Sequence, residues 1–166
     1  MPSLSDSSAE FRELLAELGV EPVGIGALAA LRYRAEPRVT TDADFLVRSL
    51  AGVAEAARGR GLHARVVTDD DGEPYLVLIR GDGVAVDVLL AETEYQRVAM
   101  SRALDGWLTV EDVIVHKLIA WRDKDRDDIA SILSTSPVLD EAYIEHWAAE
   151  WEVGDRWAAA LSAGPS

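Results

Sequence analysis

The chain has 166 residues, of which 49% are hydrophobic, and its formal net charge at pH 7 is −14. This length and composition predict one folded domain and exclude wholesale disorder. The strong acidity argues against a general binder of nucleic acids or anionic membranes, because such proteins normally present a basic face. The absence of cysteine excludes disulfides and thiolate metal sites.

The beginning of the chain, MPSLSDSSAE, contains neither the basic nor the apolar region of a secretion signal, and no apolar run reaches transmembrane length. We therefore expect a cytoplasmic protein that has no membrane partner. Ser7 and Glu10 form a capping-box pattern, which predicts a first helix that ends at Gly19. A glycine turn, GIGA, then predicts a short helix. A strand over residues 43–47 and an alanine-rich helix over 49–58 are expected next.

Three β segments follow, LHARVVT, PYLVLI and VAVDVLL, and two glycine-containing turns join them. This arrangement predicts an antiparallel meander. The rest of the chain is predicted to be helical, with helices near 94–103, 109–121 and 125–133 and a tryptophan-rich C-terminal part. Thr109 is the expected N-cap of the second of these helices.

These elements predict an α/β (α+β) fold with a single mixed β-sheet flanked by helices. We expect one domain over residues 1–166. Within it, an α/β core would span residues 20–108 and a helical part would span 109–166.

An acid pair opens the predicted strand 43–47. Asp42 and Asp44 are spaced two apart, so in a strand their side chains would share one face. Aspartate is a poor strand former, and like charges this close repel each other unless a cation lies between them. Oxygen ligands favour Mg²⁺ or Mn²⁺. The alternative is a solvated strand start with both acids in water.

A third carboxylate, Asp87, lies in the middle of a later predicted strand. Val84, Val86 and Val88 alternate onto one face of this strand, which places Asp87 on the opposite face. A buried carboxylate without a partner is costly. Beside the first strand, Asp87 would complete a three-carboxylate metal site; the alternative is an acid on a solvent-facing side of the sheet.

Lys117 is one of only two lysines in the chain and lies within the apolar stripe of its predicted helix. Directed inward, its ammonium would need an anion, either a protein carboxylate or a bound phosphate. The alternative is that it reaches solvent past Trp121. Asp125 and Asp128 share one face of the next helix; they would either join such a site or simply complement the helix dipole.

In chain order, the glycine turn, the helix, the sequence R-x-T-x-D-x-D entering a strand, and a later strand with a lone Asp resemble the nucleotidyltransferase superfamily with a polymerase-β-like fold. The segment TVEDVIVHKLIAWRDKDRDDIASIL is similar to helices of the abortive-infection-type nucleotidyltransferase toxins of type IV toxin–antitoxin systems and related proteins. The resemblance covers about residues 20–134.

The resemblance implies a Mg²⁺- or Mn²⁺-dependent enzyme that moves a nucleoside monophosphate from an NTP to a hydroxyl acceptor. It implies a catalytic set of Asp42, Asp44, Asp87 and Lys117, of which the three aspartates bind metal. It implies nucleotide binding by Gly26, Ala27, Arg38, Thr40 and Lys117. Asp125 and Asp128 would orient Lys117 or the acceptor. The family turn usually has Ser or Thr where Ala27 stands, so a hydroxyl contact to phosphate is missing here.

The acceptor stays open between RNA, a protein and a cationic small molecule. An RNA acceptor would need a local basic patch, for which Arg32, Arg34 and Arg38 are the candidates. A cationic acceptor, as in small antibiotic nucleotidyltransferases of the aminoglycoside or lincosamide type, suits the acidic chain better. A third hypothesis is a catalytically weak member that acts as a protein-binding or antitoxin-like module, with the tryptophan-rich tail as its partner surface. A toxin role would add a cognate antitoxin as a partner.

Overall fold

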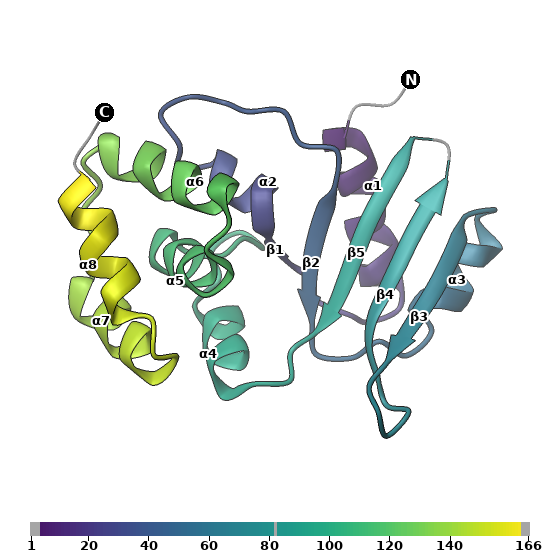
Figure 1. Ribbon diagram of the computed structural model, residues 1–166. Coiled ribbons are helices and arrows are strands. Elements are labelled where there is room, and N and C mark those ends of the chain that lie inside the picture. Colours follow the sequence, from purple (N-terminus) through teal and green to yellow (C-terminus); the bar gives the residue numbers. More distant parts are fainter. Residues whose placement is uncertain (1–3, 82, 164–166) are drawn as a thin grey trace.

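The computed structural model describes residues 4–81 and 83–163, which form one mixed β-sheet with helices on both of its faces (Figure 1). The strands are β1 (Val23–Ile25), β2 (Ala43–Val47), β3 (His63–Thr68), β4 (Pro74–Gly81) and β5 (Val84–Leu90). The helices are α1 (Leu4–Glu17), α2 (Gly26–Leu31), α3 (Val53–Gly59), α4 (Glu94–Arg102), α5 (Val110–Ala120), α6 (Asp123–Ser134), α7 (Glu141–Glu150) and α8 (Gly154–Ala163).

The sheet has the strand order β1-β2-β5-β4-β3. Strands β3, β4 and β5 pair as the expected antiparallel meander, and β2 pairs with β5 in parallel. Strand β1 pairs antiparallel with β2 and was not predicted. Its three residues, with a glycine in the middle, are too few to show a strand periodicity. The mixed sheet that the sequence predicted is confirmed.

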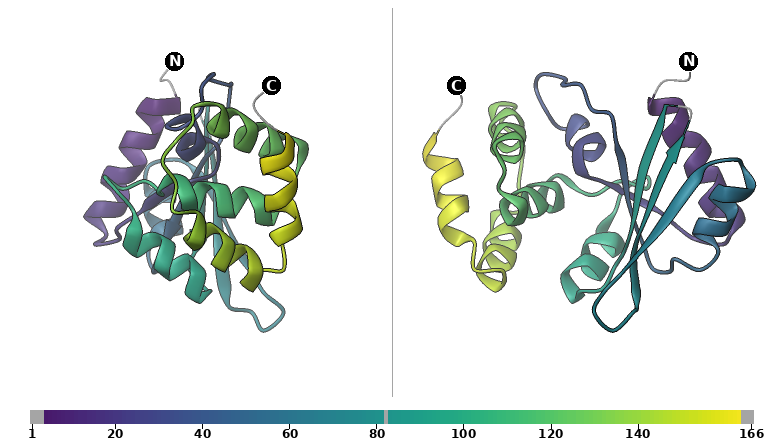
Figure 2. Two further views of the ribbon diagram at one scale, coloured as in Figure 1. Left: turned by 90° about the vertical axis from the view of Figure 1, so that its left-hand side faces the viewer. Right: turned by 45° about the vertical axis from the view of Figure 1, so that its right-hand side comes forward.

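The two faces of the sheet are covered differently (Figure 2). Helices α1 and α3 cover one face, where apolar side chains such as Leu15, Phe45, Val77 and Val88 form one core. The other helices lie on the opposite side, where a second core forms around Leu46, next to β1 and β2. On this side, the face of the outer strands β3 and β4 is left without a covering helix (Figure 2).

Several predicted helix boundaries were wrong by a few residues. Helix α1 already includes Leu4, so Ser7 lies inside the helix and is not its N-cap. Helix α3 begins at Val53 rather than at residue 49, because Gly52 takes a left-handed conformation with φ of 75° just before it. Helix α6 begins two residues earlier than expected, at Asp123.

The helical part follows the predicted pattern. Thr109 caps α5, and its side chain accepts a hydrogen bond from the Asp112 amide. In the C-terminal pair, Trp157 is buried, whereas Trp151 is 39% exposed. Within the described ranges, no helix is both long enough and apolar enough to span a bilayer.

Candidate active site

Asp44 and Asp87 lie directly opposite each other in the sheet. The parallel pairing of β2 with β5 puts Asp44 in register with Asp87, and both side chains point to the face opposite the α1–α3 core. Cross-strand neighbours in register have their Cβ atoms about 5 Å apart. Asp87 therefore lies beside the first acidic strand, which is the placement that a shared metal site would require.

Gly26 determines how closely Asp44 can approach the turn between β1 and α2. A Cβ atom on Gly26 would lie 2.1 Å from Asp44 Oδ2, and Gly26 has a φ of +63°. Only glycine allows both this conformation and this contact. The turn that was expected to hold phosphate is thus shaped, in this structure, around the carboxylate of Asp44.

The surroundings of Asp44 make its charged form less favourable than it is in water. Burial raises the pKa of Asp44 to about 6, and the neighbouring carboxylates of Asp87 and Asp42 contribute to the rise. Lys117 acts in the opposite direction but does not cancel these effects. A cation placed between the carboxylates would remove the repulsion.

Asp87 has a cationic neighbour that the sequence did not indicate. Arg80 Nη1 lies 2.7 Å from Asp87 Oδ1, but this nitrogen donates hydrogen bonds to the carbonyls of Ile79 and Val86. Asp87 Oδ1 is buried and accepts no hydrogen bond from any described residue. The charge of Asp87 is therefore balanced by Arg80, whereas the hydrogen-bonding capacity of Oδ1 is not used by a described residue.

Asp42 precedes β2 and lies in solvent. Its carboxylate accepts a hydrogen bond from the Thr41 hydroxyl at 2.5 Å, and its carbonyl accepts one from Thr40 at 3.3 Å. Thr40 therefore helps to shape the strand entry. Asp42 therefore matches the alternative of a solvated acid at the start of the strand, whereas Asp44 does not. Its charge still contributes to the raised pKa of Asp44.

Lys117 is directed inward, as its place in the apolar stripe predicted, and its side chain is 6% exposed. Its Nζ lies 3.1 Å from Asp125 Oδ1 and 2.8 Å from Asp128 Oδ2, and both carboxylates are fully buried. Burial raises the pKa of Asp128, but hydrogen bonds from Arg38 and Lys117 outweigh it and bring the pKa down to about 2. The anions that Lys117 needs are thus protein carboxylates.

Asp128 also anchors the loop that leads to the acid pair. Arg38 donates to both oxygens of Asp128, at 2.8 and 3.1 Å, and Arg34 donates to Asp128 Oδ1 at 2.6 Å. The loop between α2 and β2 arches over to α6 in this way (Figure 1). Arg38, Lys117, Asp125 and Asp128 therefore form one buried ionic cluster that fixes Asp42 and Asp44 relative to the helices.

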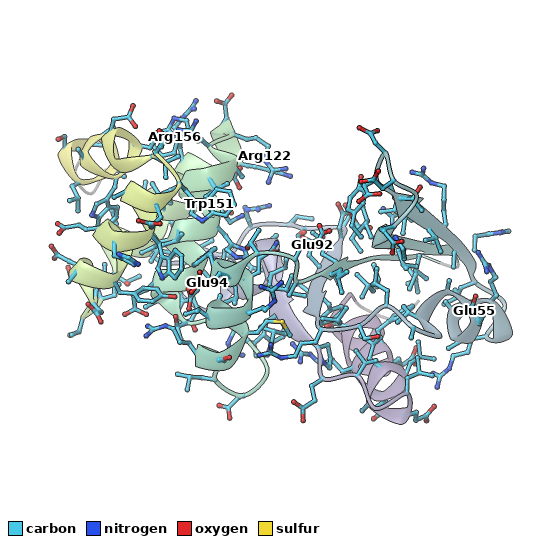
Figure 3. All side chains as sticks on the ribbon, turned by 90° about the horizontal axis from the view of Figure 1, so that it is seen from below. Glu55, Glu92, Glu94, Arg122, Trp151 and Arg156 are labelled. Carbon is cyan, nitrogen blue, oxygen red and sulfur yellow. The ribbon has the colours of Figure 1, made fainter. Side chains whose placement is uncertain are left out.

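A cleft of about 270 Å³ opens between the carboxylates and the helical part. Its polar lining includes Asp44, Asp87, Lys117, Asp125 and Arg122, and Gly26 forms part of its wall. Arg122 reaches from the helices toward the sheet (Figure 3), and its side chain is 60% exposed although it donates to Asp125 Oδ2 at 2.7 Å. Ala27, Arg38, Thr40 and Asp42 are not among the lining residues.

The sequence analysis did not single out Arg80, His116 or Arg122. His116 lines the cleft, and burial lowers its pKa to about 4, so it is neutral at pH 7. The register of β4 against β5, with Gly81 opposite Val84 and Leu78 opposite Asp87, brings Arg80 diagonally next to Asp87. No sequence signal pointed to His116.

Two of the three predicted carboxylates are placed to bind a hard divalent cation. Two carboxylates on neighbouring strands, one with a buried oxygen that accepts no hydrogen bond from a described residue, are ligands that Mg²⁺ or Mn²⁺ accepts, and Mg²⁺ often takes only one or two carboxylates from a protein. In the described part of the chain, however, no three histidine or acidic side chains are arranged so that they could hold a metal ion together. Asp44 and Asp87 are therefore placed to bind a divalent cation together, whereas Asp42 is not.

Comparisons of the fold with solved structures find related architectures over nearly the whole chain. The solution structure of the antibiotic-resistance factor ANT(2″)-Ia matches with a TM-score of 0.58 and 14% identity, over 95% of this chain and 94% of that one. An antigenic nucleotidyltransferase-like protein from Paracoccidioides brasiliensis matches with a TM-score of 0.54 and 15% identity, over 96% and 92%. JHP933 from Helicobacter pylori matches with a TM-score of 0.54 and 15% identity, over 91% and 78%.

At the level of sequence, no family model and no curated protein matches this chain. Identities near 15% show a shared fold rather than a shared activity. The chain therefore has a nucleotidyltransferase-like fold, with a mixed sheet, flanking helices and a helical C-terminal part.

Proposed function

We propose that the protein is a divalent-metal-dependent nucleotidyltransferase that moves a nucleoside monophosphate from an NTP to a hydroxyl acceptor. The observation that carries the proposal is the juxtaposition of Asp44 and Asp87 in register on parallel strands, in one cleft with Lys117 and Arg122. Carboxylates would hold Mg²⁺ or Mn²⁺, and cations would face the triphosphate. The nucleotidyltransferase-like fold supports this assignment.

In this reaction the acceptor oxygen forms a bond to the α-phosphorus, the bond from that phosphorus to the bridging oxygen breaks, and pyrophosphate leaves. Asp87 is the residue to take the hydroxyl proton, because its Oδ1 accepts no hydrogen bond from a described residue, although it has an ion-pair contact with Arg80 at 2.7 Å. Metal held by Asp44 and Asp87 would supply charge stabilisation to the attacking and leaving oxygens.

The helical side of the cleft would position the phosphates. Arg122 is the most exposed cation there and keeps free donors, whereas Lys117 is already bound by two carboxylates. We propose that the charge of Lys117 attracts the phosphates at a distance, while its ammonium group stays bound to Asp125 and Asp128 and does not contact a phosphate directly. Arg38 acts through Asp128 as a positioning residue for the loop that carries Thr40 and Asp42.

The test is transfer of label from each α-labelled NTP, with Mg²⁺ or Mn²⁺, to components of a cell lysate. Asp44→Asn should reduce metal-dependent transfer by about 100-fold or more, because it removes one carboxylate ligand. Asp155→Asn, an exposed acid in α8, is the matched control and should transfer as the wild type does. Unchanged transfer by Asp44→Asn would overturn the metal role.

A toxin role is a finer proposal within the same function. It is supported by the likeness of the α5–α6 segment to the toxin branch, and it would imply a cytoplasmic RNA or protein acceptor and a cognate antitoxin. Expression of the wild type and of Asp44→Asn in a bacterial host would test it. Growth arrest by the wild type alone is expected.

A second candidate function is that of a catalytically weak protein-binding module. The observation that favours it is the Arg80 guanidinium, which already faces Asp87 at 2.7 Å where a metal would have to bind. Calorimetric titration with Mn²⁺ and NTPs separates the two functions, because clear metal-dependent nucleotide binding would speak against the weak-module hypothesis.

A further inference from the structure

A basic surface lies on β3 and β4, on the same side of the sheet as Asp87, although the chain as a whole is acidic. The face of β3 and β4 on the same side as Asp87 is formed by alternate residues of the two strands, which are His63, Arg65, Val67, Leu76, Leu78 and Arg80. None of these six residues is acidic. We call this set the open face, because none of the helices in residues 4–81 and 83–163 covers it (Figure 2).

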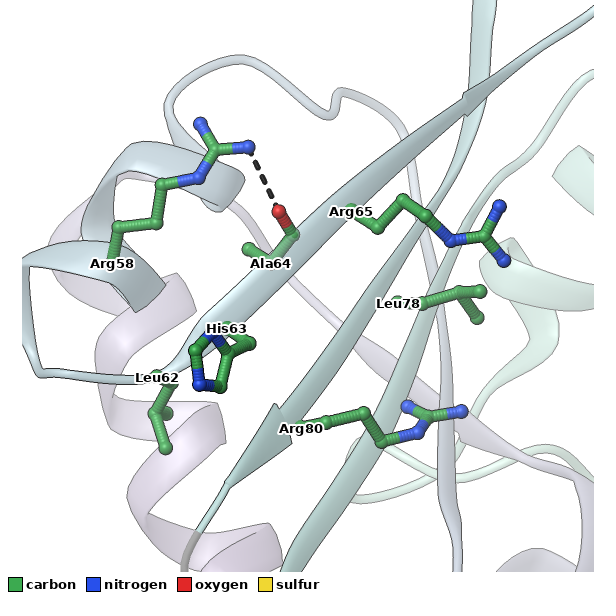
Figure 4. Close-up of a pocket in the computed structure, with 7 residues that line it drawn as sticks. All are labelled: Arg58, Leu62, His63, Ala64, Arg65, Leu78 and Arg80. Atoms are coloured by element: carbon green, nitrogen blue, oxygen red, sulfur yellow. Dashed lines mark hydrogen bonds between the residues drawn. The ribbon is translucent and has the colours of Figure 1, made fainter.

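The cations of the open face lie close together. His63 is in register with Arg80, and Arg65 is in register with Leu78, so Arg65 and Arg80 are diagonal neighbours on adjacent strands. Diagonal Cβ atoms are about 7–8 Å apart. In Figure 4 the two arginine side chains extend in the same direction, and Leu78 lies between their guanidinium groups. Two like charges on one face are unfavourable unless an anion lies between them.

The open face has its own hollow. A cleft of about 570 Å³ is lined by Arg58, Leu62, His63, Ala64, Arg65, Leu78 and Arg80 (Figure 4). Arg58 lies near the edge of the sheet, where it donates to the Ala64 carbonyl. Within the described residues, Arg65 has no ion pair or hydrogen bond, so its guanidinium is available to a ligand. Leu78 supplies an apolar floor between the cations.

This cleft leads directly to the proposed catalytic carboxylate. Leu78 is in register with Asp87, and Arg80 lies 2.7 Å from it. A ligand that lies along Arg65 and Arg80 would therefore place its end at Asp87. A cationic acceptor would meet like charge at Arg65 and Arg80 on this route.

The arginines that the sequence favoured for an RNA-binding patch are used elsewhere. Arg34 and Arg38 are bound to Asp128, and Arg32 lies over the Trp107 ring at 5.3 Å. The basic surface next to the site is thus on β3 and β4. The arginines available to a nucleic acid are therefore Arg65 and Arg80, not the three that the sequence suggested.

We propose that the open face binds the 3′-terminal segment of a single-stranded RNA, with its phosphates on Arg65 and Arg80 and its terminal hydroxyl at Asp87. This inference rests on the proposed function and names its acceptor. Charge complementarity favours a polyanion with several phosphates over a single anionic group, because Arg65 and Arg80 lie on the open face and Arg58 lies at its edge.

The test uses a fluorescent single-stranded RNA of about 12 nucleotides, a length typical of such sites, and fluorescence anisotropy without NTP. Wild-type protein should bind with an affinity that falls as salt rises, and Arg65→Gln should weaken binding about 3- to 10-fold and lower the salt slope by about 0.7. Arg60→Gln is the control, because Arg60 pairs with Glu17 of α1 on the other side of the sheet. It should bind like the wild type.

A second arm separates this inference from the proposed function. Metal-dependent NTP binding, measured by calorimetry, should be the same for Arg65→Gln and wild type. Label from the NTP should move to RNA with a free 3′ hydroxyl and not to the same RNA ending in a 3′ phosphate. If NTP binds but RNA does not, or if Arg65→Gln binds RNA as well as wild type, the open face is not the acceptor site. If the label moves to a protein or a cationic small molecule, the RNA proposal is likewise overturned.

Discussion

At the scale of single residues, the pair of Asp44 and Gly26 shows how the site constrains the chain. The Asp44 carboxylate occupies the space that a Gly26 side chain would need, and it is partly desolvated beside two other acids. Such an arrangement costs folding free energy and is retained in proteins mainly where function requires it. The cost can be measured without any substrate.

Asp44→Asn should stabilise the metal-free protein. Folding raises the pKa of Asp44 from 3.8 to about 6, so the penalty for ionising it is absent below about pH 4 and complete above about pH 6. Stability should therefore fall as the pH rises through this window. Asparagine removes the charge, and urea unfolding at pH 7 should give a gain of about 1–3 kcal/mol. A loss of stability at pH 7, with no change in pH dependence, would contradict the raised pKa.

Gly26→Ala should destabilise the protein by about 2–4 kcal/mol, because it combines a positive φ with a clash against Asp44 Oδ2. In the Asp44→Ala background the clash with the carboxylate is gone, so the same substitution should cost only about 1–2 kcal/mol. A double-mutant cycle by urea unfolding measures this coupling. Equal costs in both backgrounds would show that backbone conformation alone explains Gly26.

At the scale of elements, the ionic cluster joins three parts of the chain. Lys117 comes from α5, Asp125 and Asp128 come from α6, and Arg38 comes from the loop before β2. The turn between the helices makes this possible, because Trp121 adopts a left-handed conformation with φ of 50° and returns α6 against α5. The cluster therefore positions the acid-bearing loop on the helices.

Asp128→Asn should cost about 3–5 kcal/mol, since it removes the buried carboxylate that Lys117, Arg34 and Arg38 share. Lys117 keeps Asp125 and Arg34 keeps Asp127, but Arg38 loses its carboxylate partner among the described residues. The neighbouring Asp127→Asn is a matched control. Asp127 is 65% exposed and, among the residues that the structure describes, pairs only with Arg34, so its loss should cost no more than about 1 kcal/mol. Urea unfolding of both variants checks the difference, and similar values for the two would refute a central role for Asp128.

At the scale of the whole molecule, the net charge of −14 acts against folding, because like charges are brought closer together in the compact state. The carboxylates of the site add to this field, and the basic open face is a local exception. Bound cations or added salt should therefore favour the folded state.

Raising NaCl from about 20 to about 500 mM should raise the midpoint of urea unfolding, since the Debye length falls to a few ångströms and repulsion between surface acids is screened. The gain should be of the order of 1 kcal/mol. The Asp128→Asn variant should show the same gain, because its buried charges are screened little. A midpoint that falls with salt would mean that surface ion pairs dominate over the net repulsion.

The sequence by itself determined which side chains share a face of a strand or a helix and where a helix begins. Alternation along VAVDVLL placed Asp87 opposite the valines, the apolar stripe of α5 directed Lys117 inward, and Thr109 capped its helix. These features follow from local geometry, which repeats every two residues in a strand and every 3.6 in a helix. The mixed sheet and the order of most elements were predictable for the same reason.

Only the tertiary structure decided which charges meet. The parallel register of β2 and β5 brought Asp44 next to Asp87, the fold of α6 gave Lys117 two carboxylates in place of a phosphate, and the sheet face left open exposed Arg65 and Arg80. These pairings join residues far apart in the chain. Their partners depend on how strands and helices pack, and no local periodicity carries that information.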